Sequence, residues 1–272
     1  MGTWRIVGTS WKTSLRGLGI AGLIAAFHLI VGLVSLAFIN ETGQVEVGGV
    51  LGGVVLLLLV LIQFFVVPAI QGGCLSFANM AVSQSPASSP FAGFKEGAGR
   101  FYGRLLGFEA LTVAMAIGLA IVALLLFGIA VVPAERVPAL GLVLALFASV
   151  VVGIGFYLFL LVASLAPAAV VVENVGVFSG VKRGLQIGRV AVGKLLLVSL
   201  ALGLTLLPVG ILIAVPTFFQ QAATSAAMGW RIVAVFLRSV VTGLATVLFT
   251  VAAVQIYRHR AGVAANPSSS AS

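Results

Sequence analysis

Side chains that can do acid, base or nucleophilic chemistry are scarce in this chain of 272 residues. The only histidines are His28 and His259, the only cysteine is Cys74, and there are six glutamates and no aspartate. None of these residues group at the spacing of metal ligands, and no Gly-Lys-Ser or Gly-Lys-Thr loop is present to hold a nucleotide phosphate. We therefore expect no catalytic machinery, no metal and no cofactor, and predict that the protein is not an enzyme.

Three polar residues interrupt long apolar stretches, and each is a functional candidate because burying polar groups in hydrocarbon is costly. His28 lies roughly 15 Å into its apolar run by helix rise. It is predicted to hydrogen-bond Gln63, although a proton relay, a substrate contact or a histidine facing lipid stay open. Arg238 either snorkels to the outer interface from a last span beginning at Ser239, or lies one to two turns deep and contacts an anion or lipid headgroup.

A second group of charged residues borders the predicted spans on one side of the membrane. Arg104 precedes Glu109, and Lys182 and Arg183 follow Glu173. We predict ion pairs that anchor interfacial helices to the ends of spans, with coordination of a coupling ion as the alternative. Glu173→Gln is accordingly expected to lower stability.

The elements that must position these residues follow from hydropathy. Hydrophobic residues make up 61% of the chain and charged residues 8%, against roughly 25% charged in soluble domains. A helix needs about 20 apolar residues to cross a hydrocarbon core about 30 Å thick. Six runs meet this length, and the predicted spans are residues 17–39, 50–72, 110–132, 141–166, 195–216 and 239–257. Pro68, Pro167 and Pro208 are expected to bring kinks or helix ends.

The basic residues fall on alternate sides of these spans. Twelve of the 15 Lys and Arg residues lie before the first span, between spans two and three, between spans four and five, and after the sixth. Because Lys and Arg are retained on the cytoplasmic side, we predict a multi-pass protein of the cell membrane with both termini cytoplasmic. Its basic face would meet anionic lipid headgroups. A nucleic-acid partner is not expected, and protein partners cannot be derived.

The chain also repeats itself. The segment Phe91-Ala-Gly-Phe-Lys-Glu-Gly97 is echoed by Phe178-Ser-Gly-Val-Lys-Arg-Gly184, and residues 3–16 are a degenerate third copy. Each copy is predicted to form a basic amphipathic helix in the membrane interface, over residues 3–16, 90–106 and 178–193. The fold class is thus all-α: a polytopic membrane protein whose six spans form three hairpins, each preceded by such a helix. Residues 1–260 are predicted to form one transmembrane domain, followed by a disordered tail at 261–272.

Two glycine ladders offer smooth helix faces at which another backbone can approach closely. Each ladder repeats every four residues, and the two consist of Gly99, Gly103 and Gly107, and of Gly180, Gly184 and Gly188.

The pattern around the second repeat resembles a known family. Pro167-Ala-Ala-Val-Val-Val-Glu173-Asn-Val-Gly176 and the following Phe178-Ser-Gly-Val-Lys-Arg-Gly-Leu-Gln-Ile-Gly188 are similar to the membrane domain of some bacterial glycerophosphoryl diester phosphodiesterases and to its stand-alone integral-membrane relatives. The resemblance implies a membrane fold and no activity, since the soluble phosphodiesterase domain has no counterpart here. The function expected from the sequence is a membrane scaffold or lipid-interacting protein, the alternative being a small-solute transporter or channel subunit; an intramembrane enzyme acting on lipids is disfavoured.

Overall fold

The computed structural model describes residues 2–36, 50–83, 89–134, 137–219 and 226–262, and this part of the chain is helical without strands. Eight helices follow one another in the described ranges: α1 (Thr3–Arg16), α2 (Leu18–Leu36), α3 (Val50–Ser83), α4 (Pro90–Arg100), α5 (Tyr102–Ala134), α6 (Pro138–Val172), α7 (Val177–Phe219) and α8 (Ala226–Ala261). Most of the predicted tail, from residue 263 on, lies outside the described residues, as does the end of the first predicted span.

Six of these helices are long and apolar enough to cross a membrane. The apolar stretches cover Leu18–Leu36, Gly53–Ser83, Tyr102–Val131, Ala139–Val172, Val177–Pro208 and Ile232–Ala261. Each contains one of the spans predicted from hydropathy or overlaps it. Several are much longer than the roughly 20 residues that a perpendicular span requires, because the helices continue beyond the apolar core of each run.

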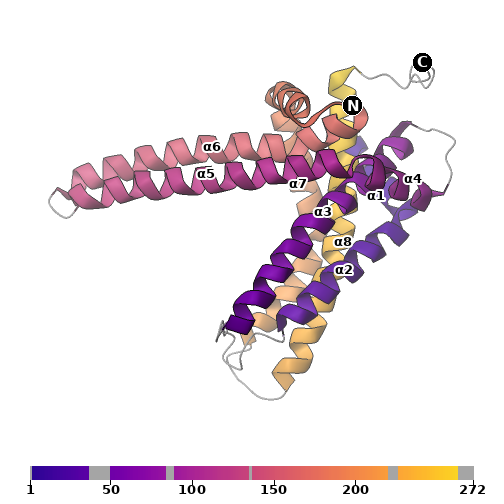
Figure 1. Ribbon diagram of the computed structural model, residues 1–272, viewed down its shortest axis with the longest axis horizontal. Coiled ribbons are helices and arrows are strands. Elements are labelled where there is room, and N and C mark those ends of the chain that lie inside the picture. Colours follow the sequence, from indigo (N-terminus) through magenta and orange to yellow (C-terminus); the bar gives the residue numbers. More distant parts are fainter. Residues whose placement is uncertain (1, 37–49, 84–88, 135–136, 220–225, 263–272) are drawn as a thin grey trace.

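The helices form two arms that diverge from a common vertex (Figure 1). One arm is the antiparallel pair of α5 and α6, and the other contains α2, α3, α7 and α8. In the second arm α2 packs mainly on α8 and makes few contacts with α3, its neighbour in sequence. The short helices α1 and α4 lie at the vertex (Figure 1), where α4 packs on α3 and α1 packs on α8 and α7.

The boundaries of two predicted interfacial helices differ from the structure. The segment 90–106 is divided at Phe101, whose amide donates to Gly97 O (3.1 Å) and whose side chain is buried. The segment 178–193 is no separate element, because α7 continues through it for 43 residues, about 65 Å. Four glycines lie in this segment, Gly180, Gly184, Gly188 and Gly193. Each interior glycine costs about 1 kcal/mol, but the first three let α7 pack closely on α6.

The helices also continue through the prolines at which kinks or helix ends were expected. Pro68 lies inside α3 and Pro167 inside α6, which ends five residues later, at Val172. Pro208 lies inside α7. Proline removes one backbone hydrogen bond, which a long helix in an apolar environment tolerates.

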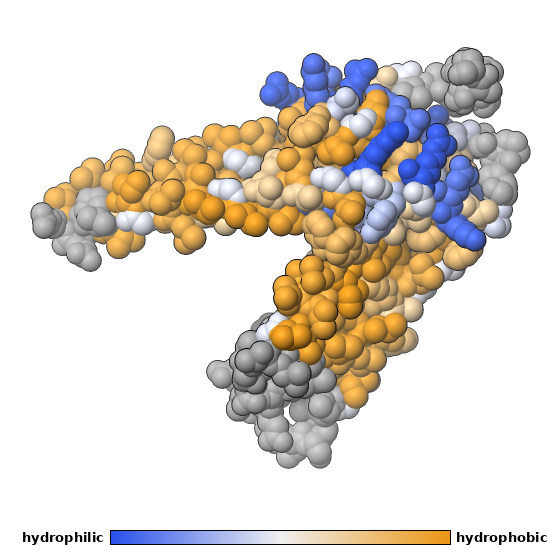
Figure 2. All heavy atoms as spheres, in the orientation of Figure 1, coloured by the Kyte–Doolittle hydropathy of each residue, from blue (hydrophilic) through white to orange (hydrophobic). Residues whose placement is uncertain are grey.

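The buried core is concentrated at the vertex. Ile24, Cys74, Phe77, Leu105 and Tyr257, from α2, α3, α5 and α8, belong to one buried cluster there. Along the arms, by contrast, large apolar side chains are exposed, among them Leu124 and Leu125 on α5 and Leu142 on α6. Figure 2 shows the same division, with hydrophobic arms and hydrophilic residues gathered at the vertex.

Candidate functional site

A partly buried hydrogen bond joins the two arms where they meet at the vertex. The hydroxyl of Tyr257 on α8 donates to Glu173 Oε1 at 2.5 Å, directly after the end of α6. Tyr257 is fully buried, and a tyrosine hydroxyl in such a place needs a partner. Arg183 of α7 approaches the other carboxylate oxygen, with Arg183 Nε at 3.3 Å from Glu173 Oε2. The Glu173 carboxylate therefore links α6, α7 and α8.

The turn after α6 explains why Glu173 points into this site. Glu173 closes the helix, since its amide donates to Ala169 O at 3.0 Å. The next residue, Asn174, takes a left-handed conformation (φ 53°), which Asn tolerates better than most residues. Arg104 of α5 fixes this turn by donating to Asn174 Oδ1 at 2.7 Å and to Asn174 O at 3.0 Å. A cation at a helix C-terminus also complements the helix dipole.

A third contact ties α8 to α3. Arg258 Nη1 donates to Asn79 Oδ1 at 2.6 Å, across 179 positions of sequence. We call the seven residues of these contacts the polar junction: Asn79, Arg104, Glu173, Asn174, Arg183, Tyr257 and Arg258. Residues from α3, α5, α7 and α8 and from the turn after α6 form it, and it lies at the basic vertex where the two arms meet.

The structure thus brings together only some of the charged pairs predicted from sequence. Glu173 and Arg183 meet, whereas Lys182 is exposed and makes no ion pair in the described part of the chain. Arg104 turns to Asn174 and away from Glu109, which is partly buried on α5. Sequence reasoning missed Tyr257 and Asn79, because neither is charged and both partners are distant in sequence.

The intramembrane candidates are arranged differently from the prediction. Among described residues no hydrogen bond joins His28 to Gln63, and Gln63 is exposed on α3. His28 instead lies near enough to Arg238 for the two to interact electrostatically. This follows from the packing of α2 on α8, in which Gly32 faces Val235. Arg238 is exposed, and α8 begins three turns before it, so the helix does not start at Ser239.

The two glycine ladders have different surroundings. A Cβ at Gly184 would lie 2.8 Å from the Ala166 amide nitrogen, and one at Gly188 would lie 3.3 Å from Leu161. Gly180 faces Val170 and Ala166 O as closely, so this whole ladder packs on α6. In the other ladder, a Cβ built at Gly99 or Gly103 would have no neighbour within 4 Å, and one built at Gly107 would have only Val177, at 3.5 Å.

Close contact between α3 and α4 uses other glycines. A Cβ at Gly72 would lie 3.0 Å from Gly97 O, and one at Gly73 would lie 2.5 Å from the Phe94 ring. These positions allow α4 to lie against α3 almost backbone to backbone, which is the role that small residues have in helix packing in membranes.

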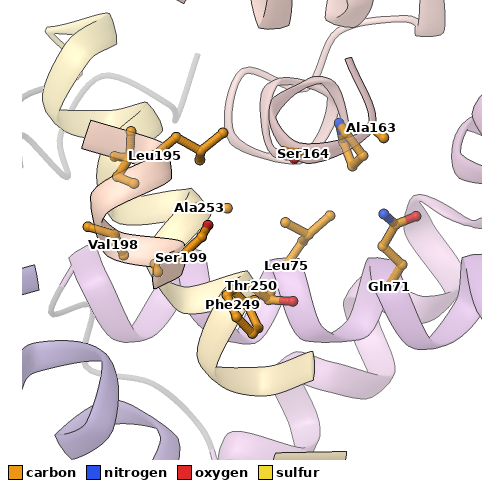
Figure 3. Close-up of a pocket in the computed structure, with 13 residues that line it drawn as sticks. Gln71, Leu75, Ala163, Ser164, Leu195, Val198, Ser199, Phe249, Thr250 and Ala253 are labelled. Atoms are coloured by element: carbon orange, nitrogen blue, oxygen red, sulfur yellow. The ribbon is translucent and has the colours of Figure 1, made fainter. Parts of the chain in front are cut away.

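A cavity of about 190 Å³ lies between α6 of one arm and α3, α7 and α8 of the other (Figure 3). Its lining comes from α3, α6, α7 and α8 and includes four uncharged polar side chains: Gln71, Ser164, Ser199 and Thr250. Figure 3 shows these side chains on different sides of the cavity. Gln71 Oε1 is buried without a hydrogen-bond partner. Ala163 also lines the cavity, and its carbonyl has no helical donor because residue 167 is proline.

Within the described residues, no group of three or more His, Cys, Asp or Glu side chains is placed to hold a metal ion. The polar junction offers hydrogen bonds and charge at one end of the molecule, and the cavity offers neutral hydrogen-bonding groups.

Comparison with known proteins gives a family without an activity. No curated protein and no solved structure matches the chain. A family model described as a domain of unknown function, DUF7847, matches residues 6–260. The chain therefore belongs to the DUF7847 family.

Proposed function

We propose that the protein is a membrane-embedded scaffold that interacts with anionic lipids through a basic face. The observation that carries this proposal is the separation of charge: two apolar arms diverge from one vertex at which the hydrophilic residues gather (Figure 2). Exposed cations at this end include Arg16, Lys95, Arg100, Lys182 and Arg189. Each Lys or Arg near an anionic surface contributes about 1 kcal/mol of attraction.

The proposed orientation places the vertex on the cytoplasmic side of the cell membrane, with both termini there. The positive-inside rule supports it. In this setting α1 lies in the interface. Trp4 and Leu15 of α1 are exposed, whereas Ile6, Val7 and Ser10 pack on the second arm. An exposed tryptophan beside lysine and arginine suits the headgroup region of a bilayer.

Stability in defined lipids tests this proposal. Cys74 is buried in the vertex core and is the only cysteine, so its reaction with a maleimide reports opening of the vertex. In nanodiscs of phosphatidylglycerol we expect labelling about fivefold slower than in phosphatidylcholine, which corresponds to about 1 kcal/mol. The difference should shrink in high salt, because salt screens exposed charges. Equal rates in the two lipids would contradict the proposal.

The cavity favours a second candidate function, a transporter or channel subunit for a small solute. Its position between the arms and its neutral polar lining suit a small uncharged molecule that forms hydrogen bonds. Internal repeats are common in transporters, although three repeats of one orientation differ from the usual inverted pair and the helices here continue through their prolines.

Glycerol uptake by proteoliposomes, followed by light scattering, separates the two candidates. A transporter should show flux above that of protein-free liposomes, and Gln71→Leu should abolish that flux. Gln63→Leu is the matched control, because Gln63 lies two turns away on the same helix and is exposed outside the cavity. Flux that does not exceed protein-free liposomes, or that survives Gln71→Leu, contradicts the transporter candidate for this solute.

A further inference from the structure

An open groove on the outside of the second arm lies apart from the polar junction. It has a volume of about 520 Å³ and lies between the N-terminal turn of α1 and one face of α7. Its lining is mostly apolar and consists of Thr3, Trp4, Leu197, Leu200, Ala201, Leu204 and Thr205. Leu197, Leu200 and Leu204 are each more than half exposed, so no part of the described chain covers them.

The α7 side of the groove runs from Leu197 to Thr205, a rise of about 12 Å. Lys194, Leu197, Ala201 and Leu204 follow the helical spacing of three and four residues and therefore share one face of α7. From Lys194 to Leu204 the helix rises about 15 Å, which is half of a hydrocarbon core about 30 Å thick. Lys194 and the groove together therefore match a headgroup and the part of an acyl chain that follows it.

Positive charge lies at one end of the groove and is absent from its walls. Lys194 stands one turn before Leu197, on the same face. The cation that the helix geometry places at this end of the groove is therefore Lys194. No charged residue is part of the groove lining itself. A ligand that fits this arrangement has an anionic head and a long apolar tail.

We propose that this groove binds one anionic phospholipid of the leaflet that meets the basic face. Its phosphate lies at Lys194, and one acyl chain runs along Leu197, Leu200 and Leu204 beside Trp4. Trp4 supplies the amphipathic ring that favours the level of the headgroups. The inference rests on the proposed interaction with anionic lipids and deepens it, because it assigns one lipid to one place.

Two pairs of matched variants test the site. Leu200→Trp fills the groove, and Leu196→Trp is its control, because both leucines lie on α7 and both are 62% exposed, yet Leu196 is outside the groove. Lys194→Gln removes the cation above the groove. Its reference is Lys182→Gln, which also removes one exposed cation of α7 from the basic face but lies outside the groove lining. A loss of retention beyond that of Lys182→Gln therefore belongs to the groove.

The readout is native mass spectrometry of the full chain released from phosphatidylglycerol or phosphatidylcholine nanodiscs. We expect the wild-type protein to retain one phosphatidylglycerol in preference to phosphatidylcholine. Lys194→Gln should weaken this retention about fivefold relative to Lys182→Gln, and Leu200→Trp should weaken it about tenfold relative to Leu196→Trp. Slow Cys74 labelling shows that each variant is folded, as Cys74 is buried in the vertex core.

The site and the wider proposal fail in different ways. If the wild-type protein shows no preference for phosphatidylglycerol, the proposed function fails. If the wild type prefers phosphatidylglycerol but either test variant retains it as well as its own control, the proposed function stands and this groove is not the site.

Discussion

Removal of the Glu173 carboxylate should loosen the junction of the two arms. Glu173→Ala leaves the hydroxyl of the fully buried Tyr257 without its acceptor at 2.5 Å. A hydrogen bond to a charged group contributes about 1.5–3 kcal/mol. The pair with Arg183 adds less, about 0–1 kcal/mol, because the Arg183 side chain is 57% exposed and screened by solvent. We therefore expect Glu173→Ala to lower the free energy of unfolding by about 2–3 kcal/mol.

Glu173→Gln should cost less, about 1 kcal/mol, because the amide oxygen still accepts from Tyr257 while the charge is lost. The double variant with Tyr257→Phe then isolates the hydrogen bond. If the bond acts as the structure indicates, Tyr257→Phe should cost much less in the Glu173→Ala background than in the wild type, by about 1–2 kcal/mol.

The chain contains a matched control for this experiment. Glu96 pairs with Arg100 at 3.8 Å, but both side chains are more than half exposed, at 66% and 56%. Such a pair contributes about 0–1 kcal/mol, so Glu96→Gln should change stability little.

The rate of maleimide labelling of Cys74 in detergent measures all these variants, because Cys74 lies in the same buried cluster as Tyr257. A loss of 2–3 kcal/mol would speed labelling by roughly thirty- to 150-fold when opening is in equilibrium. Labelling of Glu173→Ala at the rate of Glu96→Gln would refute the reasoning.

Four further variants probe the packing of the vertex. Gly184→Ala should destabilise by about 1–3 kcal/mol, since its Cβ would lie 2.8 Å from the Ala166 backbone. A Cβ at Gly103 would have nothing within 4 Å, so Gly103→Ala should be neutral or stabilise by about 0.5–1 kcal/mol through helix propensity. A larger loss of stability in Gly103→Ala than in Gly184→Ala would contradict the glycine contacts. Arg104→Gln should cost about 1–2 kcal/mol by freeing the turn at Asn174, and an unchanged Cys74 labelling rate would argue against that role. Asn79→Leu should speed Cys74 labelling about fivefold or more, because Arg258 loses its hydrogen-bond acceptor. A labelling rate equal to that of the wild type would show that this contact contributes nothing to stability.

Much of the fold could be predicted from sequence, because a bilayer constrains helix length and hydropathy so strongly. Six apolar runs gave six helices long enough to span. The boundaries were harder. Hydropathy marks where a helix meets water and does not mark where it ends, so α5 begins at Tyr102, eight residues before the predicted span. Likewise α7 continues across the basic segment, because Lys and Arg are themselves good helix formers.

The site was predicted less completely, for a physical reason. Opposite charges near each other in sequence suggested Glu173 with Arg183, and the structure places them together. Tertiary packing decides the other contacts. Arg104 meets Asn174 across 70 positions, and Arg258 meets Asn79 across 179; no local pattern encodes such pairs. The cavity at Gln71 depends on four helices at once. The resemblance to the phosphodiesterase membrane domains stays a prediction.

Access of a membrane-impermeant maleimide to single cysteines in intact cells tests the central claim most directly, namely that the basic vertex lies at the cytoplasmic face and both arms extend away from it. In a Cys74→Ala background, Lys182→Cys reports on the vertex and Val137→Cys on the far end of the α5–α6 arm, and both positions are exposed. We predict that Val137→Cys is labelled in intact cells and that Lys182→Cys is labelled only after the cells are opened. Labelling of Lys182→Cys in intact cells, or labelling of both positions from the same side, would contradict the account.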